Sequence, residues 1–405
     1  MTTHVMTGND AASTAVKLAR VQVIAAYPIT PQSPVVENLS KWVEEGELPA
    51  EFVAVESEHS ALTVCIGAST VGARAFTATS ANGLAYMTEQ VWWAAGARLP
   101  IVMCVANRAM AAPWNVLNDQ QDSMSVRDAG WVQLYCRDNQ EILDTTAQAF
   151  RIAEEVGLPV MVCYDGFLLS HTMMPVDVPD ADVVDGFLPP RAGALQVVDV
   201  NDPRNVGPVV MADPRKDAEG ALQPGYMEIR AMHNAALLEA LDAVPAADAE
   251  WEQATGRSWG GLTSDYLLDD AEVVLVAAGS LVTQLTLVAE QLRAEGVHAG
   301  VLGVRCYRPF PVEALRTKLA GRKLALVFDK ALSYGYQGPI SEDLKAALYA
   351  AEDAPAVYGA ICGLGGRDVT PDQLAQTARD ALADLEAGVV DRSPVWVNLN
   401  EGSMR

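Results

Sequence analysis

Short apolar runs separated by helical patterns recur along this chain, and they constrain its fold more than any other feature. The runs contain β-branched residues and do not alternate with polar ones, which is typical of strands buried on both faces of a parallel sheet. In the first half they lie at residues 21–26, 52–55, 75–78, 101–106, 132–135 and 160–164. In the second half they lie at residues 271–280, 299–304, 324–329 and 395–397. The sequence therefore predicts an α/β protein in which a doubly wound domain precedes a second α/β domain.

The spacing of the runs also suggests domain boundaries. We expect a first domain at residues 1–235, a connector at 236–265 and a second domain at 266–405. Between Pro175 and Pro224 many prolines, glycines and aspartates interrupt the pattern. This composition predicts an ordered excursion or a loop rather than another strand and helix.

Two helices are expected after the excursion. One runs from about Met227 to Leu241, and residues 246–261 are then a connector. The other follows Gly279-Ser280 at the end of an apolar run. A helix N-terminus at a strand end is a candidate anion site, although packing and support of an interface is the favoured interpretation. The turn is not a complete GxGxxG motif, so dinucleotide binding is unsupported.

Composition argues against several classes of protein. No apolar stretch approaches the length of a membrane span and the N-terminus lacks a signal-peptide pattern, so we expect a cytoplasmic protein without membrane contact. The formal net charge of −24 argues against a nucleic-acid partner. Six cysteines are scattered without a CxxC pair, so we do not expect an iron–sulfur cluster on this chain. Cys65, Cys104, Cys163 and Cys306 lie in apolar segments, where we expect small buried side chains.

The segment Tyr27-Pro28-Ile29-Thr30-Pro31 follows the first apolar run. Its two Xaa-Pro steps stop the strand and restrict the backbone on either side of Ile29-Thr30. The hydroxyl of Thr30 is thereby held at the carboxyl end of a strand, where open α/β sheets bind their ligands. Capping of the next helix is the alternative role for this residue.

Further motifs occur in a fixed order along the chain: VESEHSA at 55–61, TSANGLAYM at 79–87, NRAMAAPWN at 107–115, DSM at 122–124, RDAGW at 127–131, YDGF at 164–167, RPFP at 308–311 and GLGGRDV at 363–369. Together with the Thr30 segment they resemble the alpha subunit of 2-oxoacid:ferredoxin oxidoreductases, most closely the pyruvate:ferredoxin oxidoreductase branch. The resemblance implies a pyrimidine-binding domain of the thiamine-diphosphate fold followed by a transketolase-C-terminal-like domain. It also implies oxidative decarboxylation of pyruvate to acetyl-CoA and CO2 with reduction of ferredoxin or flavodoxin.

An acidic residue is needed where thiamine diphosphate places its pyrimidine ring. Glu56 and Glu58 both follow the strand expected at 52–55, and alternation does not decide which one faces the crevice. Either acid could equally favour a helix start through the helix dipole. The resemblance implies that Glu58 is the catalytic and cofactor-binding acid.

A 2-oxoacid presents a carboxylate that an arginine can bind through two charge-assisted hydrogen bonds. Arg108 follows the strand expected at 101–106, and its alternative role is that of an ordinary surface arginine. The resemblance implies that Arg108 and Thr30 bind the substrate. Trp114 departs from the smaller aliphatic residue that is usual in the family, which bears on pocket size.

Ser80 and Asn82 lie in a tight polar step after the strand expected at 75–78. They are candidate cofactor-binding residues, and a helix cap is an equally good interpretation. The Gly365-Gly366 loop is an interface loop by resemblance and a simple turn by its own chemistry.

This chain lacks a Gly-Asp-Gly motif with a downstream asparagine, the oxygen-rich arrangement that holds Mg²⁺ and diphosphate in thiamine enzymes. We therefore expect another chain to complete the site. The resemblance implies a beta subunit with the diphosphate site, a delta subunit or domain with [4Fe–4S] clusters, and a gamma subunit. Two alternatives remain: the same chemistry on a branched-chain or aryl 2-oxoacid, and a non-catalytic scaffold subunit.

Overall fold

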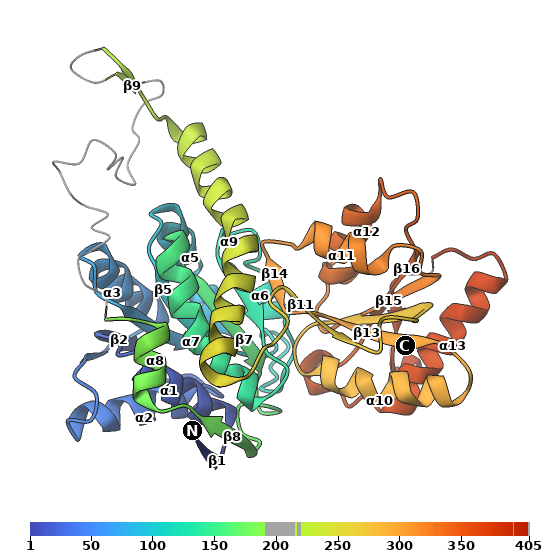
Figure 1. Ribbon diagram of the computed structural model, residues 1–405, viewed down its shortest axis with the longest axis horizontal. Coiled ribbons are helices and arrows are strands. Elements are labelled where there is room, and N and C mark those ends of the chain that lie inside the picture. Colours follow the sequence, from blue (N-terminus) through green and yellow to red (C-terminus); the bar gives the residue numbers. More distant parts are fainter. Residues whose placement is uncertain (191–214, 217–219, 392, 404–405) are drawn as a thin grey trace.

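The computed structural model describes residues 1–190, 215–216, 220–391 and 393–403 of the chain. Its two halves each contain a largely parallel sheet covered by helices, and they lie side by side (Figure 1). The α/β prediction is therefore confirmed. The division of the chain at residues 235 and 265 stays a prediction.

The first sheet has seven strands in the order β14-β6-β7-β5-β4-β2-β3. All neighbours pair in parallel except β14, which is antiparallel to β6. The parallel strands match the predicted apolar runs within two residues at each end. They are β2 (Val23–Ala26), β3 (Glu51–Ala54), β4 (Ala75–Thr79), β5 (Ile101–Asn107), β6 (Val132–Tyr135) and β7 (Val160–Asp165).

Helices cover both faces of this sheet. One apolar cluster joins its strands to α1 (Gly8–Leu18), α2 (Ser33–Glu44), α7 (Asn139–Val156), α8 (Ala181–Phe187) and α9 (Tyr226–Thr255). The other face packs on α3 (Glu58–Thr70), α4 (Ala81–Tyr86), α5 (Thr88–Gly96) and the short α6 (Gln121–Met124). Because both faces are buried, the strands read as continuous apolar runs.

The second sheet has the order β11-β13-β12-β15-β16-β17, with only β11 antiparallel. Its strands are β11 (Thr263–Tyr266), β12 (Val273–Ala277), β13 (Ala299–Val304), β15 (Leu324–Asp329), β16 (Ala356–Ile361) and β17 (Val395–Trp396). The helices of this half are α10 (Leu281–Ala294), α11 (Val312–Leu319), α12 (Pro339–Leu348) and α13 (Pro371–Glu386), with short 3₁₀ turns at Leu364–Gly366 and Glu401–Ser403.

The two halves share structure that the sequence does not predict. Strand β14 (Cys306–Arg308) comes from the second half but pairs with β6 as the edge strand of the first sheet. Arg305, which is buried, donates hydrogen bonds to Glu141 at 2.9 Å, to Gln148 at 2.7 Å and to the Gly261 carbonyl at 2.8 Å. One apolar cluster also continues from the first sheet into the second half.

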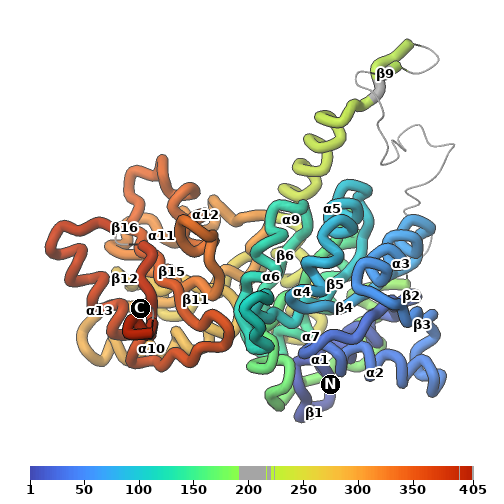
Figure 2. Tube along the Cα trace, turned by 180° about the vertical axis from the view of Figure 1, so that it is seen from behind, coloured from blue at the N-terminus to red at the C-terminus, as the bar shows by residue number. Residues whose placement is uncertain are grey.

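Helix α9 differs from the helix predicted at Met227 to Leu241. It continues through Pro245 to Thr255 and so fills much of the segment in which the sequence predicts a connector. A proline inside a helix costs about 3 kcal/mol, but the side chains of Val244 and Trp251 are fully buried against the first half. The N-terminal part of α9 extends away from the body of the molecule (Figure 2).

The described part of the predicted excursion is ordered. Strand β8 (Met174–Val178) pairs antiparallel with β1 (Thr2–Met6), and α8 packs against α9. The short strands β9 (Arg215–Lys216) and β10 (Leu222–Gln223) pair beyond it. Residues 191–214 and 217–219 of the excursion lie outside the described residues.

Candidate active site

A cavity of about 540 Å³ opens at the carboxyl ends of β2, β4 and β5 and beside the start of α3. This is the edge at which open α/β sheets bind ligands. Four of the five predicted site residues line it together with Trp114: Thr30, Glu58, Asn82 and Arg108. Its other lining residues are Pro28, Ile29, Gly83, Tyr86 and Val116.

Glu58 is the first residue of α3, which begins there because Ser57 caps the helix by accepting a hydrogen bond from the Ser60 N–H. The Glu58 side chain is 8% exposed, and its carboxylate makes no hydrogen bond with any described residue. Gly83 packs directly on it: a Cβ at that position would lie 2.8 Å from Glu58 Oε1. The cavity therefore contains an acceptor that the described chain leaves unused.

Glu56 lies elsewhere. It is exposed, does not line the cavity, and accepts a hydrogen bond from the Ser60 hydroxyl, which lowers the pKa of its carboxyl below the usual value. Of the two acids that the sequence left as alternatives, Glu58 faces the cavity and Glu56 does not.

Arg108 follows β5 and is 5% exposed. Its Nη1 donates to the Thr30 carbonyl at 2.6 Å, whereas its Nε is buried and has no partner among the described residues. Burial lowers the pKa of Arg108, and Asp122 and Glu58 partly offset this. An unsatisfied buried donor costs about 1–3 kcal/mol, so the position of Arg108 is not one that folding stability alone favours.

Thr30 and Trp114 complete the substrate side of the cavity. Thr30 is exposed, and its backbone carbonyl is the anchor of the Arg108 guanidinium. The indole of Trp114 lies over that guanidinium at 5.9 Å and is 77% exposed. The aromatic ring thus forms the outer wall of the cavity.

Ser80 and Asn82 differ in their position relative to the cavity. The Ser80 hydroxyl donates to the Ala106 carbonyl at 2.7 Å, makes no helix cap and does not line the cavity. Its side chain turns toward the backbone of β5 and away from the cavity, and its role in cofactor binding stays a prediction. Asn82 does line the cavity, and its Oδ1 accepts from the Ala111 N–H at 3.0 Å.

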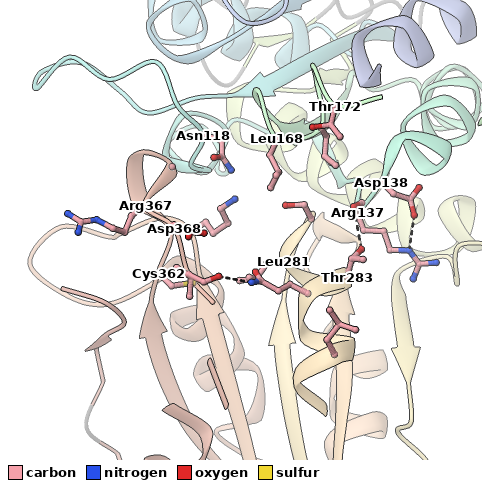
Figure 3. Close-up of a pocket in the computed structure, with 18 of the residues that line it drawn as sticks. Asn118, Arg137, Asp138, Leu168, Thr172, Leu281, Thr283, Cys362, Arg367 and Asp368 are labelled. Carbon is pink, nitrogen blue, oxygen red and sulfur yellow. Dashed lines mark hydrogen bonds and ion pairs between the residues drawn. The ribbon is translucent and has the colours of Figure 1, made fainter. Parts of the chain in front are cut away.

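A second cavity, of about 520 Å³, lies between the two halves (Figure 3). The N-terminus of α10, which the sequence offers as an anion site, meets the protein's own carboxylate there: the Ser280 N–H donates to Asp165 Oδ2 at 3.2 Å. Lys330 donates to Asp165 Oδ1 at 2.8 Å. Burial raises the pKa of Asp165, but Lys330 and the hydrogen bonds outweigh it, so the pKa is lowered. This contact supports the interface interpretation of the turn.

All six cysteines are buried, including the four for which the sequence predicts burial. The described side chains contain no cluster of three or more His, Cys, Asp or Glu residues that could hold a metal ion. In the same part of the chain, none of the helices combines the length and apolarity needed to cross a bilayer.

Comparison with known families gives two matches. Residues 14–236 match the domain described as pyruvate flavodoxin/ferredoxin oxidoreductase, thiamine diphosphate-binding. Residues 271–374 match pyruvate:ferredoxin oxidoreductase core domain II. Together the matches cover most of the chain, and the first contains all five predicted site residues.

Among solved structures, a 2-oxoglutarate:ferredoxin oxidoreductase from Magnetococcus marinus, with 2-oxoglutarate, coenzyme A and succinyl-CoA bound, has the same fold, with a TM-score of 0.66 at 18% identity. It covers 93% of this chain, which spans 65% of that longer chain.

Several known proteins are similar to this chain over nearly its full length. The pyruvate synthase subunit PorA of Methanocaldococcus jannaschii is 43% identical over 98% of both chains. PorA of Methanothermobacter thermautotrophicus is 41% identical over 100% of both. The ketoisovalerate oxidoreductase subunit VorA of Pyrococcus abyssi is 42% identical over 98% of this chain and 97% of that protein. The chain therefore belongs to the pyruvate:ferredoxin oxidoreductase family.

Proposed function

We propose that this chain is the alpha subunit of an enzyme that oxidatively decarboxylates pyruvate to acetyl-CoA and CO2 and passes the electrons to ferredoxin or flavodoxin. The observation that carries the proposal is the pairing of two polar side chains in one cavity, the Glu58 carboxylate and the Arg108 guanidinium. One group accepts and the other donates, so together they suit a basic ring nitrogen and an anionic substrate.

Glu58 fits the aminopyrimidine of thiamine diphosphate. Its carboxylate is buried, has no hydrogen-bond partner among the described residues and is given room by Gly83, so a protonated ring nitrogen can satisfy it. Thiamine diphosphate, when bound, supplies the nucleophilic carbon that 2-oxoacid decarboxylation requires. The role of Glu58 is to hold a proton at the ring nitrogen. Asn82 faces the same cavity and is proposed to contact the cofactor.

Arg108 and Thr30 are proposed to bind and orient the substrate. The guanidinium is already fixed by the Thr30 carbonyl at 2.6 Å, so little side-chain freedom is lost when a carboxylate binds. Its Nη2 group makes no hydrogen bond with a described residue and can pair with one carboxylate oxygen. The exposed Thr30 side chain stands beside the 2-oxo group in this arrangement.

Partner chains are proposed to supply the rest of the enzyme. A beta subunit brings the Mg²⁺–diphosphate site, a delta subunit brings [4Fe–4S] clusters and a gamma subunit completes the assembly. In favour of this, the sequence lacks the diphosphate motif, the curated relatives are named as subunits, and Trp114 and Tyr86 are left exposed at the mouth of the cavity. Coenzyme A would accept the acyl group, and we propose a cytoplasmic location.

The test compares Glu58→Gln with Glu56→Gln in the complex purified through this chain. Under anaerobic conditions, with pyruvate, coenzyme A and thiamine diphosphate, we expect wild type and E56Q to reduce a viologen dye. E58Q should lose at least about 100-fold in kcat, because an amide cannot supply the charge that general acid–base activation needs. Normal turnover in E58Q, with all subunits present, would refute the proposal and favour a scaffold.

A second candidate substrate is a branched-chain 2-oxoacid such as ketoisovalerate. The specific observation is the outer wall of the cavity, which is built from the exposed Trp114 ring rather than from buried groups. A panel of 2-oxoacids on wild type and Trp114→Leu separates the candidates. If the indole limits the cavity, W114L should raise kcat/KM for ketoisovalerate relative to pyruvate by about tenfold, the value of one or two methylene contacts.

A further inference from the structure

A third carboxylate lies behind the cavity walls. Asp122, in α6, is 0% exposed and does not line the cavity. Its Oδ1 accepts from Asn107 Nδ2 at 2.7 Å and from the Ser123 N–H at 2.8 Å. Its Oδ2 accepts from the Ala81 N–H at 2.9 Å and from the Arg108 N–H at 3.0 Å. All four partners are donors, so only a carboxylate satisfies them all.

The bond to Ala81 controls the cofactor side of the cavity. Ala81 is the first residue of α4 and has a φ of +44°, a conformation that residues other than glycine rarely adopt. Ser80, at the N-cap position, provides no side-chain cap. Asp122 Oδ2 therefore holds the start of this helix, and the next two residues, Asn82 and Gly83, form the wall around Glu58.

The bond to Arg108 controls the substrate side. Asp122 fixes the backbone of Arg108, and the Thr30 carbonyl fixes its guanidinium. The neighbouring Asn107 is tied to the same carboxylate. Burial raises the pKa of Asp122 to about 6, so the group is ionised at neutral pH and its hydrogen bonds are charge-assisted.

We propose that Asp122 is a positioning residue that sets the distance between the substrate wall at Arg108 and the cofactor wall at Asn82-Gly83, because one buried oxygen holds both backbones. The role rests on the function proposed above. It requires no contact between Asp122 and either ligand. Its consequence is that loss of the carboxylate loosens two walls at once.

The experiment compares Asp122→Asn with Asp119→Asn in the intact complex. Asp119 is a matched control: it is buried, lies one turn away, and accepts backbone N–H bonds from Gln121 and Gly365, each at 3.1 Å. We expect D122N to lower kcat/KM for pyruvate by about 100-fold, mainly through KM, because a 1 Å misplacement has that effect. D119N should stay within about threefold. Both variants should lose thermal stability.

A rescue separates positioning from general stability. Glycine adopts positive φ without the steric penalty, so Ala81→Gly in the D122N background should recover about fivefold in kcat/KM. The same change in the D119N background should recover nothing. Should D122N not assemble, Asn107→Ser, whose shorter side chain takes the donor away from the intact carboxylate, is expected to raise KM by a smaller factor.

The outcomes are distinguishable. If wild type reduces no dye with any 2-oxoacid, the proposed function fails. If wild type is active but D122N and D119N behave alike, or A81G rescues neither or both, the positioning role is overturned while the function stands. An unchanged KM in N107S also overturns it.

Discussion

Gly83→Ala is expected to damage the active site with little effect on the stability of the fold. A Cβ on Gly83 would lie 2.8 Å from Glu58 Oε1, 2.9 Å from Glu58 Cγ and 2.6 Å from Thr79 Oγ1. Ordinary van der Waals contact begins at 3.4 Å, so the Glu58 carboxylate must move by roughly 0.6 Å. Thr79 is fully buried and leaves no room on its side.

Two opposing effects decide the stability change. Overpacking costs about 1–3 kcal/mol. Replacing glycine by alanine inside α4 stabilises the helix by about 1 kcal/mol. The net loss is therefore about 0–2 kcal/mol, which a large domain tolerates. The catalytic effect has no such offset, and a displaced acid should lower kcat by about 100-fold.

Gly67→Ala is the matched control. Gly67 lies in α3, the helix that Glu58 begins, and a Cβ there would meet nothing within 4 Å. This variant should gain up to about 1 kcal/mol of stability and keep its activity. Dye-reduction kinetics and thermal melts of the two complexes provide the comparison. Wild-type kcat in G83A, or an equal loss in G67A, would refute the steric argument.

Two further predictions concern stability. Arg305→Ala should cost about 3–5 kcal/mol, because it removes the buried guanidinium that pairs with Glu141 Oε1 and leaves that carboxyl only its contacts with Arg137; Lys323→Ala, at an exposed ion pair, should change the urea midpoint little. Burial raises the pKa of Asp329 to about 7 from 3.8, so the folded chain binds the extra proton and stability falls as pH rises from about 4 to 7. Asp329→Asn should therefore show a smaller difference in melting temperature between pH 5 and pH 7.5 than wild type, and an equal difference would contradict this assignment.

The parallel strands of the first sheet and β12, β13 and β15 of the second could be predicted because burial on two faces leaves a local signal, a continuous apolar run. Strands β11 and β16 of the second sheet are absent from the predicted runs. Strand β14 could not be predicted, because three residues at 306–308 carry no period and their partner β6 lies far away in the sequence. Strand β1 could not be predicted for the same reason, since it pairs with β8 about 170 residues later. The predicted helix ends at about Leu241, shortly before Pro245, which is a local stop signal. Helix α9 continues to Thr255 because the tertiary burial of Trp251 outweighs that signal.

Site residues follow the same logic. Thr30, Glu58 and Arg108 come within four residues of the carboxyl ends of strands, so topology brings them to one edge of the sheet, as the sequence predicts. The orientation of Ser80 depends on a carbonyl of the neighbouring strand, which no motif records. The sequence identifies Asp122 only as part of a motif, because Asp122 binds backbone N–H groups of two distant segments and these contacts leave no local pattern.

The position of the second half explains the Gly363-Val369 motif. The loop after Arg108 carries Trp114 on the cavity side, and its next residue, Asn115, donates to the Gly365 carbonyl at 2.9 Å. The Gly366 N–H donates to the Asn118 carbonyl at 2.7 Å, and a Cβ on Gly366 would lie 2.4 Å from Leu117.

Gly365 and Gly366 both have positive φ, at 59° and 70°. Side chains at these positions would be strained and would also push the loop away. The second half thus acts on the site without reaching it: its glycines allow close backbone contact with the loop whose other face forms the substrate wall. Asp119 accepts a hydrogen bond from Gly365, at the contact with the second half, whereas Asp122 accepts one from Arg108, at the cavity.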